Sequence, residues 1–528
     1  MKNANTSYKI LSAVIYVAFI LFMCVVIANK DNLHVDGFFS YGLSNQTYTD
    51  HIGMAPLEGK VYTPAESAWQ EYLTVQEGAR FDYGNIWKNQ AEDVHPPLYY
   101  VLLHTICSLF PNRFSIWFAA FINILFAVLT LLVSQKIVRE LGGSNKIVLL
   151  FSVAFSLSAG MLSAVSLLRM YLMTMFWVTL VSWLFLKIYR NDGNPKSFAA
   201  VSVVCAAGTL THYYFVVWLF FLCFVMGVSL LWGKKWKKIL AFVVSVGAGE
   251  IASILIFPGM IYHIFLENGD RGEQSVQKLL YTSKSENLEK LTDYFGYLNE
   301  QLFGGLLPLL IVLIAASFIV VTVSVRKKKV TAEKIFPWFL LGIPCVCYYV
   351  LIARISVYTA DRYIQPIYPV VLIVGLGSVL ISMEKLLKNR GLFLIVSGLL
   401  VLLMSVNGLR ICPWEYLYKE DGRMFQQLDA YADCDCLFVY DANDPYNRIQ
   451  QSFFEVSRYR SVVFVADTDL EMLENISLEN KEQLILCIDF ACDTEAVLEA
   501  LEAVNQRFSS AVELGKAGLY TTTWYLGE

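Results

Sequence analysis

The chain has 528 residues, of which 56% are hydrophobic and only 16% are charged, with a formal net charge of −4. An ordinary soluble protein carries about 25% charged residues, so this composition excludes that class. The weakly acidic balance gives no general attraction to nucleic acid, and we expect no nucleic-acid partner. Aromatic residues make up 14% of the chain, as expected where Trp and Tyr line the interfaces of a lipid bilayer.

Apolar stretches long enough to cross a bilayer recur before the composition changes near residue 410. The first, 10–28, exceeds the about 7–15 residues of a signal-peptide core, so we expect a retained helix rather than a cleaved signal. Ten further crossings are predicted at 115–138, 147–163, 168–188, 196–212, 213–232, 239–257, 304–325, 335–352, 363–382 and 392–408. The apolar stretch 97–110 is short for a crossing and is predicted to be re-entrant or interfacial.

The orientation of these crossings is predicted from the loops that carry Lys and Arg. Five loops are basic, and they contain Lys136, Arg139 and Lys146; Lys187, Arg190 and Lys196; Lys234, Lys235, Lys237 and Lys238; Arg326, Lys327, Lys328 and Lys329; and Lys385, Lys388 and Arg390. By the positive-inside rule all five are cytoplasmic, which requires a cytoplasmic N-terminus and eleven crossings. The polar regions 29–96, 258–303 and 353–362 then share the outer face with the C-terminus.

The first predicted outer loop, 29–96, carries an acidic residue shortly after the first crossing. Asp36 lies about eight residues beyond that crossing, where a carboxylate can accept a proton from an attacking hydroxyl. The plainer interpretation is a loop acid that faces water, which is what most loop acids do.

A second acidic segment ends the same loop, with the sequence Glu92-Asp93-Val94-His95-Pro96-Pro97-Leu98-Tyr99-Tyr100. Two carboxylates and an imidazole that can meet a phosphate precede a proline pair, which fixes how the chain enters the membrane. The alternative is a simple helix start, because Pro suits the first turn. Asp93 and His95 have the spacing of metal ligands, but two ligands define no site, so a divalent metal is left open and no other cofactor is predicted.

Three later motifs also lie at predicted outer boundaries: Arg169-Met170-Tyr171, Thr211-His212-Tyr213-Tyr214 and Asp361-Arg362-Tyr363. An arginine at the depth of Arg169 pairs with an anion or extends to the headgroups. Arg354 and Arg362 could clamp a phosphate, because guanidinium offers a fork of donors. The alternatives are an ion pair of Arg362 with its neighbour, a headgroup contact for Arg354, and a structural role for His212 among aromatic residues.

From residue 410 the sequence predicts a separate small domain. Strands are expected at 436–441, 461–466 and 483–490, helices at 447–459 and 493–508, and one or two closing strands in the last twenty residues. Alternating strands and helices indicate an α/β domain. It has no Gly-rich phosphate loop, so its expected role is structural or in docking an acceptor.

The fold class predicted for the whole chain is therefore a polytopic α-helical membrane protein with about eleven transmembrane helices and a small C-terminal extracytoplasmic α/β domain. The expected domains are 1–409 and 410–528.

The motifs resemble, in order, those of the membrane glycosyltransferases of the GT-C superfold, specifically the glycosyltransferase family 39 type. That group contains protein O-mannosyltransferases and the aminoarabinose transferase acting on lipid A. The resemblance runs from residue 10 to about 382 and rests on Asp36, His95-Pro96-Pro97-Leu98-Tyr99-Tyr100, Arg169-Met170-Tyr171, Thr211-His212-Tyr213, and Arg362-Tyr363 followed by Pro366 and Pro369. Two departures are Gly37, where many relatives carry a second acid, and His95, where the aminoarabinose branch carries Lys.

The resemblance implies a glycosyltransferase that moves a sugar from a polyprenyl-phosphate donor to a hydroxyl of a lipid, glycan or protein acceptor at the outer face of the cell membrane. It implies catalytic roles for Asp36 and Asp93. The implied substrate-binding residues are Glu92, His95, Tyr99, Arg169, Tyr171, His212, Tyr213, Arg354, Arg362 and Tyr363. Attack opposite the phosphate leaving group would invert the anomeric centre.

Other functions compete with this interpretation. A flippase or transporter of a lipid-linked sugar also needs many helices, but transporters usually show paired repeats and midplane charges. An oligosaccharide polymerase or ligase would share the carrier and the general layout. A receptor or scaffold that binds through its tail leaves the acidic segments unexplained.

Overall fold

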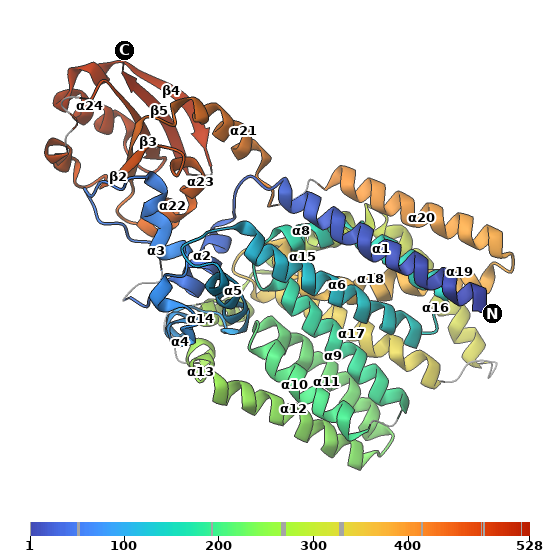
Figure 1. Ribbon diagram of the computed structural model, residues 1–528. Helices are drawn as coiled ribbons and strands as arrows, with labels where there is room; N and C mark the ends of the chain where they lie inside the picture. Colours follow the sequence, from blue (N-terminus) through green and yellow to red (C-terminus); the bar gives the residue numbers. More distant parts are fainter. Residues whose placement is uncertain are drawn as a thin grey trace. The chain divides into compact units, whose positions relative to one another are not determined.

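The computed structural model describes residues 2–49, 53–191, 194–265, 271–326, 332–412, 416–476, 478, 481–518 and 520–527 (Figure 1). Lys327, Lys328 and Lys329 of the fourth basic loop lie outside the described residues. The chain packs into two compact units, neither of which is continuous in sequence. Unit 1 comprises Met1–Ile27, Val94–Tyr99 and Ala119–Glu415, and unit 2 comprises Ala28–Asp93, Tyr100–Phe118 and Tyr416–Glu528.

Unit 1 is built almost entirely of helices. They are α1 (Lys2–Ala28), α6 (Ile116–Glu140), α7 (Asn145–Ser156), α8 (Ala159–Ser166), α9 (Tyr171–Asn191), α10 (Pro195–Thr209), α11 (Tyr214–Trp232), α12 (Trp236–Ile256), α13 (Gly259–Phe265), α14 (Arg271–Tyr281), α15 (Lys284–Tyr297), α16 (Leu307–Arg326), α17 (Ala332–Ile355), α18 (Tyr368–Leu372), α19 (Ser378–Leu386) and α20 (Arg390–Ile411). Short π-helical turns at Leu298–Leu302 and Ile373–Gly377 interrupt two of these runs.

The helices of unit 1 have the length and composition of membrane spans. Among the residues described, eight helices are long and apolar enough to cross a membrane, or up to ten if each of two bent pairs is one span. The prediction of about eleven crossings also counts α10, which has 15 residues. The predicted non-crossing stretch 97–110 forms α5 (Leu98–Leu109), a helix of only 12 residues.

One of the bent pairs shows how the sequence breaks a span. The helical run Lys284–Leu302 and the start of α16 are bent by 89°. Gly304 and Gly305 lie in the break with φ of 55° and 83°, a region that glycine enters without a steric penalty. Asn407 donates a hydrogen bond to the carbonyl of Gly304 and so holds the turn.

Unit 2 contains the C-terminal α/β fold that the sequence predicts. Its sheet has strands β1 (Asp435–Tyr440), β2 (Ser461–Ala466), β3 (Gln483–Asp489), β4 (Ala511–Ala517) and β5 (Thr521–Gly527) in the order β2-β1-β3-β5-β4. β1 pairs in parallel with β2 and β3, whereas β5 pairs antiparallel with β3 and β4. Its helices are α21 (Lys419–Leu428), α22 (Pro445–Gln451), α23 (Phe453–Val456) and α24 (Thr494–Val504).

The two helices predicted in the tail are shorter in the structure. The expected helix 447–459 is divided into α22 and α23, because the hydroxyl of Ser452 bonds back to the carbonyl of Ile449 at 2.8 Å. The expected helix 493–508 ends at Val504, because Asn505 adopts an extended conformation and its amide holds the carbonyls of neighbouring loop residues. Asp493 caps α24 by accepting from the backbone N–H groups of Glu495 and Ala496.

The first predicted outer loop packs with this sheet inside unit 2. It forms α2 (Val35–Asn45), α3 (Gln70–Leu73) and α4 (Tyr83–Glu92). Tyr62 exchanges two backbone hydrogen bonds with Val462 of the edge strand β2, at 2.9 and 3.0 Å. Trp69 is fully buried, and its ring meets Phe453 and Phe464 at 5.7 and 5.6 Å. The loop therefore covers a sheet edge that would otherwise be open to pairing.

Candidate functional site

Unit 1 brings four of the sequence motifs together around His212. The ring of His212 lies 5.8 Å from that of His95, 5.2 Å from that of Tyr171 and 4.7 Å from that of Tyr214. Tyr363 completes the group, with its ring 6.4 Å from Tyr171 and 5.6 Å from Tyr214. We call these five residues, with Arg169 and Arg362, the His212 cluster.

Local hydrogen bonds place His212 and His95 beside each other. The backbone N–H of Leu98 donates to the carbonyl of Leu210 at 2.9 Å, which joins the proline segment to the turn after α10. Within that turn, the N–H of Tyr214 donates to Nδ1 of His212 at 3.0 Å, so the neutral ring carries its proton on Nε2. Both interactions fix where the two imidazoles lie.

The electrostatic surroundings of His212 are basic. His212 is buried, with 6% of its surface exposed. Burial, together with the neighbouring side chains of His95 and Arg169, holds the pKa of His212 well below its usual range. His212 is therefore neutral at pH 7 with its proton on Nε2, whereas Arg169 keeps its charge at any ordinary pH.

Arg169 lies in the break between α8 and α9 and is 4% exposed. The side chain of Asn123 holds this break by donating to the carbonyls of Val165 and Leu167 at 3.0 and 2.8 Å. Tyr171 begins α9 directly after the break and is 3% exposed. The guanidinium of Arg169 is thus buried and close enough to His212 to lower the pKa of that imidazole.

Hydrogen bonds from Tyr348, Gln301 and Gln365 hold the short segment that carries Arg362 and Tyr363. The guanidinium carbon of Arg362 lies 5.1 Å from the ring centroid of Tyr363, whose carbonyl accepts from the hydroxyl of Tyr348 at 3.0 Å. The neighbouring carboxylate of Asp361 accepts from the amides of Gln301 and Gln365 at 3.1 and 2.9 Å. Asp361 is 2% exposed, and these two bonds tie the turn that carries Arg362 to the side chains of Gln301 and Gln365.

The other predicted residues of unit 1 are Tyr99, Tyr213 and Arg354, and each has its own surroundings. Tyr99, in the first turn of α5, is fully buried. Tyr213 donates to or accepts from Nδ1 of His263 in α13 at 2.8 Å. Nε of Arg354, in the last turn of α17, donates to the carbonyl of Leu279 at 2.8 Å, so its contact is with the backbone of α14.

The acidic residues predicted to be catalytic lie in unit 2. Asp36 is the second residue of α2, and its carboxylate is partly exposed. His34 caps this helix: Nδ1 accepts from the N–H of Asp36 at 3.1 Å and lies 3.6 Å from its Oδ2. The carboxylate of Asp36 is therefore held at a helix N-terminus, where negative charge is stabilised.

Glu92 is the last residue of α4, and Asp93 is its C-cap. The carboxylate of Glu92 accepts from the hydroxyl of Tyr48 at 3.3 Å in an exposed position. Asp93 is largely buried, with 9% of its surface exposed, and its N–H donates to the carbonyl of Asn89 at 3.0 Å. Among the described residues, no group of three or more His, Cys, Asp or Glu side chains could hold a metal ion, so Asp93 and His95 gain no third ligand there.

Several residues of these sites were not selected from the sequence. His34 stands two positions before Asp36, a spacing typical of a helix cap, and that signal was available. Tyr214 belongs to the motif Thr211-His212-Tyr213-Tyr214, but only the structure shows its ring near those of both His212 and Tyr363. His263 lies 50 residues from Tyr213 in a polar segment, and nothing in the sequence connects the two.

No protein-family model matches this sequence, and no curated protein matches it. Solved structures do match, at low identity. ArnT from Cupriavidus metallidurans in the apo state is 12% identical, with 99% of this chain and 98% of that chain covered and a TM-score of 0.51. The same protein bound to undecaprenyl phosphate is 14% identical over 96% of this chain and 97% of that chain, with a TM-score of 0.50. An apo oligosaccharyltransferase from Archaeoglobus fulgidus gives 10% identity, 96% and 74% coverage, and a TM-score of 0.44.

The two ArnT structures show the fold of this chain over almost its whole length. The predicted GT-C superfold is confirmed, as is the predicted combination of a polytopic helical membrane protein with a small C-terminal sheet. The chain is a multi-pass membrane protein of GT-C fold.

Proposed function

We propose that this protein is a glycosyltransferase that moves a sugar, with inversion, from a polyprenyl-phosphate donor to an acceptor hydroxyl at the outer face of the membrane. The observation that carries the proposal is the His212 cluster, where Arg169, His95 and Arg362 come from three separate segments to one group of aromatic rings. The fold supports it, because one of the matching ArnT structures is bound to undecaprenyl phosphate.

In the proposed reaction, the acceptor oxygen bonds to the anomeric carbon while the bond from that carbon to the phosphate oxygen breaks. The electron pair of the broken bond goes to the phosphate, whose growing charge Arg362, Arg169 and His95 stabilise. Tyr171, Tyr213, Tyr363 and His212 line the donor site, with Tyr99, Glu92 and Arg354 as further substrate-binding residues. The proton of the acceptor hydroxyl goes to Asp36, with Asp93 as a second catalytic carboxylate.

The acceptor is a lipid, glycan or protein hydroxyl, and the C-terminal domain of residues 410–528 is extracytoplasmic. A cytoplasmic N-terminus follows from the basic loops. The same orientation puts Asp36 and Arg362 on the outer side of the bilayer.

Asp36→Asn tests the role of the carboxylate. We expect turnover to fall by about 10²–10⁴, because an amide cannot accept the proton, while carrier binding and the unfolding temperature stay unchanged. The measurement is release of polyprenyl phosphate by purified protein offered a panel of polyprenyl-phosphate sugars. Glu77→Gln, which removes an exposed acid of the same unit, is the matched control.

Retained turnover in Asp36→Asn would remove Asp36 from the reaction. If wild-type protein releases no carrier from any donor of the panel but moves lipid-linked sugars across vesicle membranes, the protein is a flippase and the proposed reaction is wrong. Release of a carrier that bears a lengthened oligosaccharide would indicate a polymerase.

A further inference from the structure

Gln301 joins parts of unit 1 that are distant in the sequence. Its side-chain amide donates to the carboxylate of Asp361 at 3.1 Å and accepts from the hydroxyl of Tyr368 at 2.8 Å. Its backbone carbonyl accepts from the hydroxyl of Ser158 at 2.9 Å. All four side chains are buried, so these hydrogen bonds form in surroundings of low dielectric constant, where each is electrostatically stronger than in water.

These bonds connect places where the helices are interrupted. Ser158 stands in the break between α7 and α8, a pair of helices bent by 51°. Gln301 lies in the π-helical turn Leu298–Leu302, directly before the bend of 89° into α16. Asp361 precedes Arg362 in a short 3₁₀ turn. Two bent pairs of helices and the turn that carries Arg362 are therefore joined through one residue.

The packing around the amide of Gln301 is close. A Cβ on Gly160 would lie 2.7 Å from the ring of Tyr368 and 3.1 Å from the Cβ of Gln301, so glycine at this position lets α8 approach both residues. Gln365, four positions after Asp361, donates to the same carboxylate at 2.9 Å. Two amides thus hold this carboxylate, and with it the backbone of the turn.

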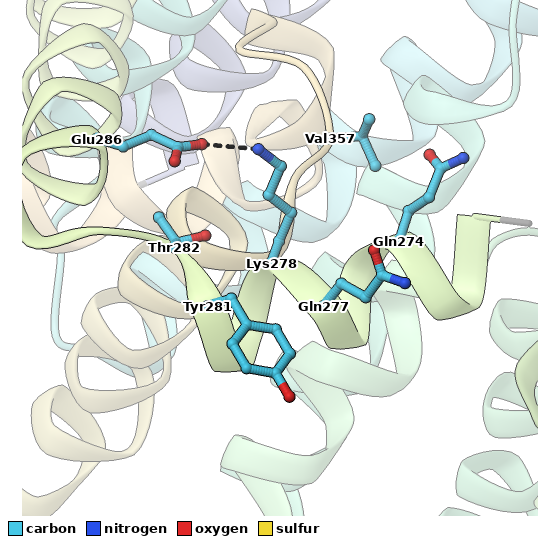
Figure 2. A pocket seen from close by; sticks show the side chains of 7 residues that line it. All are labelled: Gln274, Gln277, Lys278, Tyr281, Thr282, Glu286 and Val357. Carbon is cyan, nitrogen blue, oxygen red and sulfur yellow. Dashed lines mark hydrogen bonds and ion pairs between the residues drawn. The ribbon is translucent and has the colours of Figure 1, made fainter. Parts of the chain in front are cut away.

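The chain that leads to this turn is held at its start by other residues. Nζ of Lys290 in α15 donates to the carbonyl of Ser356 at 2.8 Å. Val357 follows and lines a pocket with residues of α14 and α15, where Lys278 and Glu286 pair at 2.8 Å (Figure 2). The start and the end of this segment are therefore held by separate sets of bonds.

We propose that Gln301 is a positioning residue for Arg362, because it fixes the turn that carries the guanidinium to the breaks of two bent helix pairs. The inference rests on the proposed function only for the identity of the anion that Arg362 meets, which is the phosphate of the carrier. An amide donates to Asp361 and accepts from Tyr368 at the same time, which neither a carboxylate nor an apolar side chain can do. Gln301 then acts on carrier binding through the position of Arg362.

The position of the turn is tested first without any ligand. Gln301→Leu keeps roughly the size of the side chain but removes the amide from Asp361 and Tyr368. Amide hydrogen exchange of full-length protein in nanodiscs is compared with that of wild type. We expect exchange within 361–367 to be about tenfold faster in the variant, while exchange next to Ser356 stays unchanged. Equal exchange of wild type and variant within 361–367 would overturn the proposal.

Gln135→Leu is the matched control for a general loss of stability. Gln135 is another buried glutamine of unit 1, which accepts from the hydroxyl of Tyr16 at 3.1 Å and donates to that of Ser152 at 2.9 Å. Both substitutions should lower the unfolding temperature, because each leaves buried polar groups without an amide. Only Gln301→Leu should weaken binding of a fluorescent polyprenyl phosphate, by about tenfold. An equal loss in the two variants, or a loss in neither, would overturn the proposal.

Gln301→Glu adds a measurement that a loss of stability does not imitate. A protonated carboxyl donates through its hydroxyl and accepts through its carbonyl, as the amide does, whereas an ionised one only accepts and faces Asp361 with like charge. We expect the carrier affinity of Gln301→Glu, relative to wild type, to fall by about tenfold between pH 5.5 and pH 8.5. The relative affinity of Gln135→Glu should stay constant. A constant value for Gln301→Glu as well would contradict a positioning role for the amide.

These measurements separate the role of Gln301 from the proposed function. If wild type binds polyprenyl phosphate and Gln301→Leu binds it equally well, the proposed function stands and the role of Gln301 is wrong. If wild type binds no polyprenyl phosphate, but Gln301→Leu speeds exchange within 361–367, the proposed function is wrong and Gln301 still positions the turn of Arg362.

Discussion

The C-terminal sheet of unit 2 and the His212 cluster of unit 1 differ in the charges that surround a buried ionisable group. In the sheet, Asp435 accepts from Nη2 of Arg460 and from the hydroxyl of Ser461, both at 2.6 Å, and also pairs with Lys481. Around His212, by contrast, burial and the neighbouring basic side chains His95 and Arg169 all lower the pKa of the imidazole.

The difference separates a structural arrangement from a functional one. Opposite charges held at hydrogen-bond distance stabilise the fold that contains them. Around His212 the fold places basic side chains beside a buried imidazole, whose pKa they lower together with burial. The proposed function gives these basic side chains the role of meeting the carrier phosphate.

The largest effect that this comparison predicts is on carrier binding in Arg362→Ala. Removing a guanidinium that meets the phosphate should weaken binding of polyprenyl phosphate by about 10- to 100-fold, because a hydrogen bond to a charged group is worth about 1.5–3 kcal/mol. Arg362→Lys should recover part of the affinity, since Lys keeps the charge but not the fork. Binding is measured on purified protein with a fluorescent polyprenyl phosphate.

The control for Arg362→Ala is Arg410→Ala, which removes an exposed arginine from the last turn of α20. The unfolding temperature of both variants should stay close to that of wild type. Carrier affinity that is the same in both would show that Arg362 plays no part in binding the phosphate, and the His212 cluster would lose its functional interpretation.

A substitution in the C-terminal sheet should have the opposite effect: it should change the stability of the protein and leave its activity unchanged. Although burial opposes it, Arg460, Lys481 and Ser461 hold the pKa of Asp435 below its usual range. Asp435→Asn should therefore lower the free energy of unfolding by roughly 1–2 kcal/mol at pH 7, since Lys481 and Arg460 are partly exposed and can be solvated.

The pH dependence of Asp435→Asn follows from the sign of that shift. A carboxyl with a lowered pKa stabilises the folded state above its unfolded pKa, about 3.9, and loses this contribution as the pH falls below it. The difference between wild type and Asp435→Asn should be full at pH 7 and shrink below pH 4. Turnover per folded molecule should not change, and a loss of turnover without a loss of stability would contradict the structural role.

Much of this fold could be predicted from the sequence, because the bilayer and the sheet each impose a simple pattern. Helices that cross a membrane need long apolar stretches, and those stretches are visible without any tertiary information. Three strands of the tail are predicted from buried apolar runs, and the one or two closing strands expected in the last twenty residues are the pair β4 and β5. The predicted crossing 196–212 is only the 15-residue helix α10 in the structure, because the chain leaves the helix after Thr209, where the N–H groups of Thr211 and His212 both donate to the carbonyl of Gly208.

The parts that sequence reasoning could not reach depend on contacts between distant residues. Nothing in 29–96 indicates that Trp69 would be buried against Phe464, almost 400 positions later. The motifs of the His212 cluster could be selected one by one, because charged and aromatic residues at a membrane boundary are unusual. Their mutual geometry, and the roles of Tyr348 and Gln301 behind them, required the structure.

Lys30 of unit 2 shares features with both regions, and its substitution gives the smallest of the expected effects. It is buried, its Nζ donates to the carbonyl of Tyr416, and it lies 5.1 Å from the ring of Tyr418. Burial lowers the pKa of Lys30 to about 7, although Asp31 and Asp421 oppose the shift. Here opposite charges are present, as in the sheet, yet burial outweighs them.

A lysine that releases its proton near pH 7 when folded, and near pH 10.5 when unfolded, makes the folded state more stable as the pH rises between those values. Lys30→Met should remove this rise. We therefore expect wild type to gain about 3 °C in unfolding temperature relative to Lys30→Met between pH 6.5 and pH 9.5. Lys419→Met, which removes an exposed lysine paired with Asp31 at 2.9 Å, is the matched control and should follow the wild-type curve. If the curves of wild type and Lys30→Met run parallel, Lys30 keeps its charge across this range, and the opposite charges of Asp31 and Asp421 outweigh burial there, just as Arg460 and Lys481 outweigh burial around Asp435.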